Sequence, residues 1–225
     1  CLVGSEMCIR DRWNSAEEIA ANPHFSDDAP GGIRIVDTNN DGSLTPEDRV
    51  ALGTPYPDFT WGITNTFQIK DFDISFLIQG VQGITVLNGD VYYNETKKWN
   101  KKYTKNRWVS AEHPGDGKTP YQNVKTGHDL MLTDYPLQNA SYACLRNFTV
   151  GYTLPATAAR KIKLSGVRFY VSGSNLLYIW GSGYKGINPE SRMTSGNYSS
   201  AMISGYQRGG FPLTSTISAG FDINF

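Results

Sequence analysis

The sequence has no excess of charge of one sign, because its 225 residues carry 21 basic and 21 acidic side chains. Charged residues make up 19% of the chain and form no basic block, which argues against a nucleic-acid-binding surface or a polybasic membrane anchor. No apolar run approaches the roughly 18 residues that a membrane-spanning helix needs. The three cysteines, Cys1, Cys8 and Cys144, fit neither a zinc-binding nor a redox spacing. These absences exclude a helical membrane protein and a disulfide scaffold.

Sequence motifs of known enzyme classes are also missing. There is no P-loop, no GxSxG elbow and no HExxH metal motif. The segment GSGYKG (181–186) matches GxGxxG, but Ile187-Asn188-Pro189 follows it where a dinucleotide-binding fingerprint requires a helix. The three histidines have no ligand spacing. We therefore do not expect an enzyme.

The chain divides into three parts. Residues 1–12 (CLVGSEMCIRDR) look like translated sequencing-adapter read-through, and we expect them to be an unstructured artefact. Residues 13–57 are expected to form an external loop region with a short helix over 14–22, which Ser15 caps and Pro23 ends. Residues 58–225 are expected to form a segment of long strands joined by turns and loops.

Alternation of apolar and polar residues with a period of two predicts these strands. In FTWGITNTFQI, the apolar residues alternate with Thr, Gly and Gln, and a tight turn at Lys70-Asp71 leads to a second strand. We expect five antiparallel, up-and-down strands at about 58–70, 72–80, 141–153, 166–178 and 213–225.

The strands favour a transmembrane β-barrel over a soluble sheet. Soluble strands usually have about five or six residues, whereas a tilted strand needs roughly 9–11 to cross a bilayer, and two strands here run about eleven or more. Their polar side carries Thr, Ser, Gly, Asn and Gln, which suits a wet barrel interior. Because a barrel needs at least about eight strands, the chain is expected to be part of a larger one.

Short and long connections alternate along the chain. The links at 70–71 and 154–166 are short, whereas 80–140 and 180–211 are long, polar and expected to be loops. Outer-membrane barrels combine short periplasmic turns with long external loops. With the C-terminus in the periplasm, every long link and residues 13–57 fall outside the cell.

The segment DTNNDGSLTPED (37–48) matches part of a calcium-binding EF-type loop, with Gly at position 6. Its possible calcium ligands are Asp37, Asn39, Asp41, Ser43 and Asp48, at positions 1, 3, 5, 7 and 12. Asp48 replaces the usual bidentate Glu, and Pro46 intrudes. The alternative is an Asx-rich turn that satisfies its own backbone. Calcium would stiffen an external loop, and no cofactor is otherwise expected.

Several collinear motifs carry a family resemblance. They are GGIRIVDTNNDGSLTPEDRVALGTPYPDFTWG (31–62), FDISFLIQG (72–80), NRW (106–108), NASYACLRNFTVGYTLP (139–155), VRFYVSGSNLLYI (167–179), YKGINPE (184–190) and the terminal GFDINF. Through them, residues 16–225 resemble the C-terminal part of SusC/RagA-type TonB-dependent transporters of Bacteroidetes outer membranes. Cys144 departs from the resemblance, because the family more often has a larger apolar or aromatic residue there.

The resemblance implies a barrel of about 22 strands with an N-terminal plug, located in the outer membrane. It implies three partners besides membrane lipid: a SusD-like lipoprotein that lids the barrel, the TonB complex acting through the missing N-terminal part, and the barrel-assembly machinery. The implied substrates are glycan oligosaccharides or peptides. Phe225 resembles the terminal aromatic signal of barrel assembly, and it could equally be the last lipid-facing residue of its strand.

One alternative function stays open, a secreted soluble β-sandwich module that binds glycans and carries a calcium loop. Aromatic side chains in the loops could stack on sugar rings, although an interfacial girdle or loop packing explains them as well. They include Tyr92, Tyr93, Trp99, Trp108, Trp180 and Tyr184. No residue is assigned to the substrate.

Overall fold

The computed structural model describes residues 7–8, 10–89, 105–121, 133–191, 205–207 and 210–225. Most regular structure in these residues is antiparallel strand, which confirms the expected all-β fold. The chain clusters into two units. The first comprises residues 1–56, 85–139 and 190–210, and the second comprises 57–84, 140–189 and 211–225.

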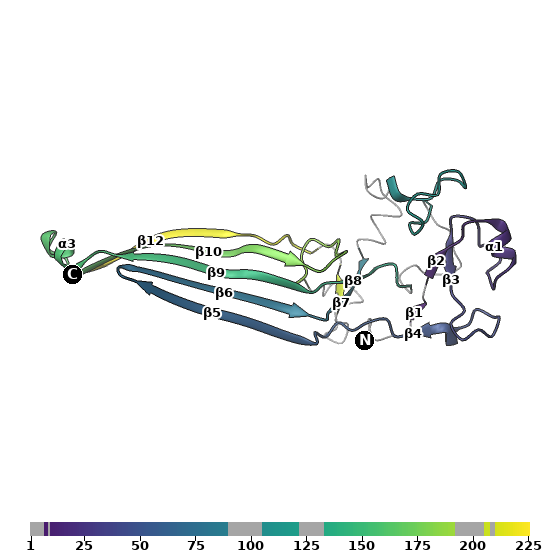
Figure 1. The fold of residues 1–225 in the computed structure, drawn as a ribbon, viewed down its shortest axis with the longest axis horizontal. Coiled ribbons are helices and arrows are strands. Elements are labelled where there is room, and N and C mark those ends of the chain that lie inside the picture. The colour runs from purple at the N-terminus through teal and green to yellow at the C-terminus, as the bar shows by residue number, and fades with distance from the viewer. Residues whose placement is uncertain (1–6, 9, 90–104, 122–132, 192–204, 208–209) are drawn as a thin grey trace. The chain divides into compact units, whose positions relative to one another are not determined.

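The second unit is built on a five-stranded antiparallel sheet (Figure 1). Its strands, in the order in which they pair, are β12 (Thr216–Asn224), β10 (Gly166–Trp180), β9 (Tyr142–Thr153), β6 (Phe72–Gln82) and β5 (Phe59–Ile69). Among these five strands, each one pairs with the strand that comes before it in the sequence, so the topology is a simple meander. The long connections leave the sheet at one end and the short ones at the other.

Local sequence explains the two short connections. Lys70 adopts a left-handed conformation with φ of 55°, which lets β5 and β6 form a tight hairpin. Between β9 and β10 the chain forms a short helix, α3 (Ala156–Lys161), that begins directly after Pro155. Proline suits the start of a helix because its fixed φ is helical and its missing N–H would have no partner there.

A β-bulge interrupts the pairing of β6 with β9. The register passes from Leu77–Asn147 to Ile78–Leu145, so Arg146 is an extra residue in β9. A bulge shifts the alternation of the strand that contains it. Leu145 therefore points to the opposite face from Asn147, although the two residues are two positions apart.

A second bulge lies at the same level in β10. Asn175 and Leu176 fall between the pairs Ser174–Asn147 and Leu177–Leu145. Asn175 has a φ of 56°, and asparagine tolerates this left-handed conformation better than most residues. The two bulges lie side by side in neighbouring strands.

The first unit contains short strand pairs. The pairs are β1 (Met7–Cys8) with β4 (Arg49–Val50), β2 (Arg10–Arg12) with β3 (Ile33–Ile35), and a three-stranded sheet of β11 (Tyr206–Gln207), β7 (Thr85–Asn88) and β8 (Leu137–Asn139). Two expectations differ from this arrangement. Residues 7–8 and 10–12 are paired strands instead of unstructured chain, and the presumed loops 80–140 and 180–211 supply β7, β8 and β11.

Buried side chains hold β3 in the first unit. Ile33 and Ile35 are buried and pack with Phe25, Leu44 and Tyr135. The helix α1 (Ala16–Ala20) follows the cap Ser15, whose hydroxyl accepts from the backbone N–H of Glu18 at 3.1 Å. The expected cap is therefore present.

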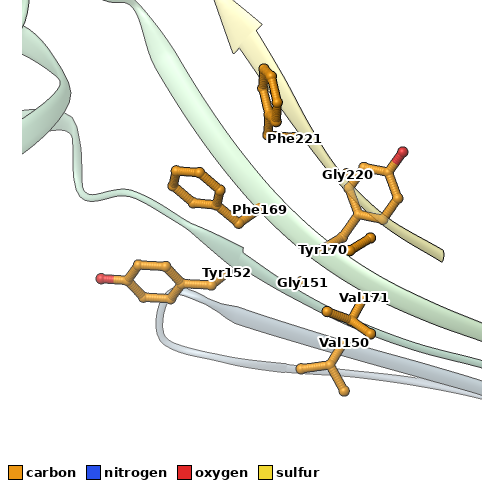
Figure 2. Close-up of a pocket in the computed structure, with 9 residues that line it drawn as sticks. Val150, Gly151, Tyr152, Phe169, Tyr170, Val171, Gly220 and Phe221 are labelled. Carbon is orange, nitrogen blue, oxygen red and sulfur yellow. The ribbon is translucent and has the colours of Figure 1, made fainter. Parts of the chain in front are cut away.

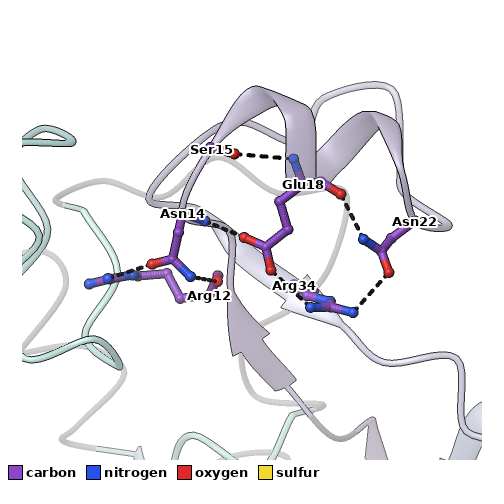
Figure 3. Close-up of polar contacts among 6 residues, drawn as sticks. All are labelled: Arg12, Asn14, Ser15, Glu18, Asn22 and Arg34. Atoms are coloured by element: carbon purple, nitrogen blue, oxygen red, sulfur yellow. Dashed lines mark hydrogen bonds and ion pairs between the residues drawn. The ribbon is translucent and has the colours of Figure 1, made fainter.

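A polar network joins α1 to β3 (Figure 3). Arg34 in β3 donates to Glu18 at 2.9 Å and to Asn22 at 3.1 Å. The other carboxylate oxygen of Glu18 accepts from the backbone N–H of Asn14 at 2.8 Å. This network holds helix α1 against strand β3, which precedes residues 37–48 in the sequence.

Candidate functional site

One face of the five-stranded sheet is apolar and exposed. Cross-strand pairs such as Ile63–Ile78 and Phe169–Phe221 lie on this face. The exposed fraction is 53% for Ile63, 44% for Phe67 and 65% for Phe221. Large contiguous apolar surfaces of this kind are rare on soluble monomers and mark contact with lipid or with another apolar surface.

A shallow groove crosses this face over β9, β10 and β12 (Figure 2). Tyr152, Phe169 and Phe221 rise along it, and Val150 and Val171 continue its lining. The lining is almost entirely apolar, so the groove suits a hydrocarbon chain better than a polar ligand.

The opposite face is polar and carries an ion pair that spans three strands. Arg168 in β10 contacts Asp73 in β6 through two bonds, Nε–Oδ1 at 3.0 Å and Nη2–Oδ2 at 2.7 Å. Its Nη1 lies 3.5 Å from Oδ2 of Asp222 in β12. The polar face is thus tied together near the short connections.

Glycine at position 151 makes this ion pair possible. Gly151 in β9 pairs with Asp73 on one side and with Tyr170 on the other. A Cβ atom there would lie 2.3 Å from Oδ1 of Asp73 and 2.5 Å from Nη2 of Arg168. Because glycine has no side chain, Arg168 can reach over β9 to Asp73.

The calcium-like loop forms a network of bonds to its own backbone. Asp37 accepts from the N–H of Gly42 at 2.8 Å, and Asn39 accepts from the N–H of Asp41 at 2.9 Å. Asp41 in turn accepts from the N–H of Ser43 at 2.8 Å. These are the contacts of an Asx-rich turn, and the three side chains that accept remain accessible to solvent in part or in full.

Asp48 occupies a different environment from the other predicted ligands. It is fully buried, and its carboxylate accepts from the N–H of Thr45 at 2.8 Å and from the N–H of Thr38 at 2.9 Å. These backbone hydrogen bonds, that of Thr45 first, hold the pKa of Asp48 below its ordinary value although burial opposes them. Asp48 closes the loop by bonding both of its ends.

The remaining predicted residues are scattered. Phe225 follows β12 and is 93% exposed. Trp180 and Tyr184 lie in contact, with ring centroids 6.2 Å apart, whereas Trp108 contacts Tyr121 in the first unit. Cys1, Tyr92, Tyr93, Trp99 and His128 lie outside the described residues.

Metal-ligating clusters and membrane-spanning helices are both absent from the described residues. These residues contain no group of three or more His, Cys, Asp or Glu side chains placed to hold a metal ion. Within the same part of the chain, no helix is both long and apolar enough to cross a membrane.

Sequence reasoning did not find the ion pair. Asp73 and Arg168 are 95 positions apart, and only the pairing of both strands with β9 brings them together. The signal in the sequence is a charged residue on the polar side of each strand, with glycine on the strand between them.

Comparison with known sequences finds TonB-dependent receptors. No protein-family profile matches the chain. TonB-dependent receptor P26 of Formosa agariphila is 30% identical over 223 residues, which cover 95% of this chain and 21% of that protein. TonB-dependent receptor SusC of Bacteroides thetaiotaomicron is 27% identical over 157 residues, which cover 69% of this chain and 15% of SusC. The chain thus spans about a fifth of these relatives or less.

Comparison with solved structures finds the same fold. The RagAB peptide importer in its open-open state matches with a TM-score of 0.63 at 18% identity, covering 91% of this chain and 20% of that one. A second structure of the RagAB peptide transporter matches with a TM-score of 0.61 at 22% identity, covering 79% of this chain and 18% of that one. The relatives named are receptors and transporters, in agreement with the expectation that the chain is not an enzyme.

Proposed function

The chain is a segment of a TonB-dependent receptor of the SusC/RagA family, a family of outer-membrane proteins, and we propose that it forms the C-terminal wall of an outer-membrane importer. The observation that carries this proposal is the two-faced sheet, which is apolar and exposed on one side and polar on the other. Lipid would contact the apolar face, and water in the barrel interior would contact the polar face.

Strand length and sheet edges support the proposal. Strands β5 and β6 each have 11 residues, which is enough for a tilted strand to cross the hydrocarbon core. The two outer strands of the sheet are β12 and β5. In lipid, an unpaired strand edge costs several kcal/mol per orphaned backbone group, so further strands of the full-length protein would pair with both edges and close the barrel.

The connections give the proposed orientation. The turn at Lys70, the segment with α3 and the terminal Phe225 all belong to one end of the strands, which would face the periplasm. The long connections that follow β6 and β10 would face the outside of the cell, as external loops do in such barrels. Phe225 would then be available to the barrel-assembly machinery at the periplasmic side.

Partners and substrates follow from the family as parts of the proposal. We infer that a SusD-like lipoprotein covers the external loops and that the TonB complex acts through an N-terminal part of the full-length protein. The substrates would be glycan oligosaccharides or peptides. RagAB is described as a peptide importer, which supports a peptide substrate for RagAB alone.

Calcium binding by residues 37–48 stays part of the proposal. Its support is the spacing of oxygen ligands at Asp37, Asn39, Asp41 and Ser43 and the solvent access to these positions. The ion would add to the hydrogen bonds that already close the loop, so its role would be to stiffen the loop outside the membrane.

The alternative function, a soluble β-sandwich glycan-binding module, receives less support. A sandwich buries one face of each sheet against the other, whereas Ile63, Phe67 and Phe221 are each more than two-fifths exposed. No observation on the described residues favours this alternative over the barrel wall.

Fractionation of cells that express the full-length gene tests the proposed function. We expect the protein in the outer-membrane fraction, extractable only with detergent, and showing the shift in gel mobility on heating that closed barrels give. Recovery in the soluble periplasmic or extracellular fraction would overturn the proposal. Growth of a gene-deletion strain on oligosaccharides or on peptides as the only carbon source would then identify the substrate class.

A further inference from the structure

A row of aromatic rings lies on the polar face of the sheet where the long connections leave it. Tyr142 in β9 and Tyr178 in β10 have ring centroids 6.1 Å apart. The row continues from Tyr178 to Trp180 at 6.3 Å and from Trp180 to Tyr184 at 6.2 Å. Trp180 is 44% exposed, whereas Tyr142 and Tyr184 are buried. The buried rings therefore support an accessible indole.

A guanidinium group lies beside Tyr178, within this row. The Arg146 guanidinium is 5.8 Å from the ring centroid of Tyr178. Its Nη1 donates to Oδ1 of Asn175 at 2.8 Å and to the hydroxyl of Tyr178 at 2.9 Å. With its amide oxygen turned toward the guanidinium, Gln79 accepts from Nη2 at 2.6 Å and from Nε at 3.1 Å. Arg146 is thus held in one orientation.

The two bulges place this cluster on the polar face. Arg146 is the extra residue of β9, and Asn175 belongs to the bulge of β10. Bulges are frequent next to binding sites because they redirect a side chain without breaking the sheet. Residues of two adjacent bulges thus contribute to one cluster.

We propose that Trp180, Tyr178 and Arg146 form a sugar-binding subsite at the external mouth of the barrel interior. This inference rests on the proposed function, because that function makes the polar face the substrate's route. The apolar C–H face of a pyranose ring would lie on the indole of Trp180, whose π-face is weakly negative. Arg146 and the amides of Gln79 and Asn175 supply the hydrogen-bonding groups that fix the hydroxyls of a ligand.

The cluster fits a neutral sugar better than a peptide. An extended peptide is most often recognised by hydrogen bonds to a free strand edge, whereas β9 and β10 are paired on both sides. The groups that hold Arg146 accept through amide and phenol oxygens, and the amide NH₂ and phenol O–H groups of the same side chains can donate to the hydroxyl groups of a sugar. A subsite of stacked rings and fixed planar polar groups therefore favours a pyranose.

Binding of oligosaccharides to the full-length protein in detergent tests the inference. The probes are neutral hexasaccharides of glucose, mannose, galactose and xylose, with a pentapeptide mixture as the comparison. Calorimetry and quenching of tryptophan emission measure the dissociation constants. We expect Trp180→Ala to weaken binding of the preferred hexasaccharide by about tenfold or more, as for an aromatic hot spot, and Trp180→Phe to weaken it less.

Two further variants separate binding from folding. Ile179→Ala is the matched control, because Ile179 is adjacent, 65% exposed and on the opposite face, and its affinity should equal that of the wild type. Tyr178→Phe keeps the ring and removes the hydroxyl that accepts from Arg146, so it should weaken binding by a smaller factor. If Trp180→Ala fails to show the heat-dependent gel shift of an assembled barrel, Trp180→Phe and Tyr178→Phe carry the test.

Three results would overturn the inference. The first is equal affinity of the Trp180 variants and Ile179→Ala. The second is quenching by the peptides alone, which would make the cluster a peptide site. The third is a wild-type protein that binds none of the hexasaccharides. None of these affects the outer-membrane fractionation, so the subsite can fail while the importer proposal stands.

Discussion

Substitution of Gly151 by alanine tests how the polar face is held together. The new Cβ would lie 2.3 Å from Oδ1 of Asp73 and 2.5 Å from Nη2 of Arg168, so the ion pair must open. The two side chains are 31% and 32% exposed, and water therefore screens part of their attraction. Losing the pair should cost about 1–2 kcal/mol, between a surface pair and a charged hydrogen bond. Alanine recovers about 0.5–1 kcal/mol of glycine's entropic penalty, which leaves a net destabilisation of about 1 kcal/mol.

The same substitution in a variant that lacks the ion pair separates loss of the pair from an effect on the β9 backbone. Urea unfolding of the full-length protein in detergent, followed by tryptophan emission, measures the destabilisation. In an Asp73→Ser background the pair is already absent and the nearest clash is removed, so Gly151→Ala should become neutral or slightly stabilising. If Gly151→Ala costs the same in both backgrounds, the penalty belongs to the β9 backbone, and the explanation through Arg168 is refuted.

Three further predictions concern the calcium-like loop and the C-terminal residue. Because the pKa of Asp48 is lowered in the folded protein, its carboxylate stabilises the loop fully at pH values above the ordinary aspartate pKa of about 4. This stabilisation is lost as the pH falls through the lowered pKa. Amide hydrogen exchange of residues 37–48 should therefore become faster in acid, and an unchanged exchange rate would contradict this. Calorimetry should show Ca²⁺ uptake near millimolar concentration that Asp41→Asn weakens, and absence of uptake in the wild type removes the site. Deleting Phe225 should lower the yield of heat-shifted barrel in the outer membrane, and a normal yield would end its role as an assembly signal.

The long strands could be predicted because each repeats its signal many times. A period of two over about ten residues leaves little ambiguity about which side chains share a face. The structure places β5 at Phe59–Ile69, where we expected a strand at 58–70. The ends are less well defined: β6 extends to Gln82, and β12 begins at Thr216 instead of residue 213. The strand ends depend on pairing with neighbours as much as on local sequence.

The short strands could not be predicted for the opposite reason. Strands β7, β8 and β11 have 4, 3 and 2 residues, which is too few for a periodic pattern. Their partners lie far away in the sequence, as in the pair Val86–Gln138. Residues 10–12 belong to the segment expected to be unstructured, yet their backbone pairs with β3. Backbone pairing needs no particular side chains, so sequence gives little warning of it.

The candidate subsite could not be predicted from the sequence pattern because of one extra residue in β9. Tyr142 and Arg146 have the same parity in the sequence as Phe148 and Val150, so strict alternation would place all four on the lipid side. The extra residue at Arg146 reverses the alternation for the outer half of β9, which moves Tyr142 and Arg146 to the polar face beside Tyr178. One inserted residue thus exchanges the faces to which alternate residues of β9 point, and only the pairing with β6 and β10 shows where the exchange occurs.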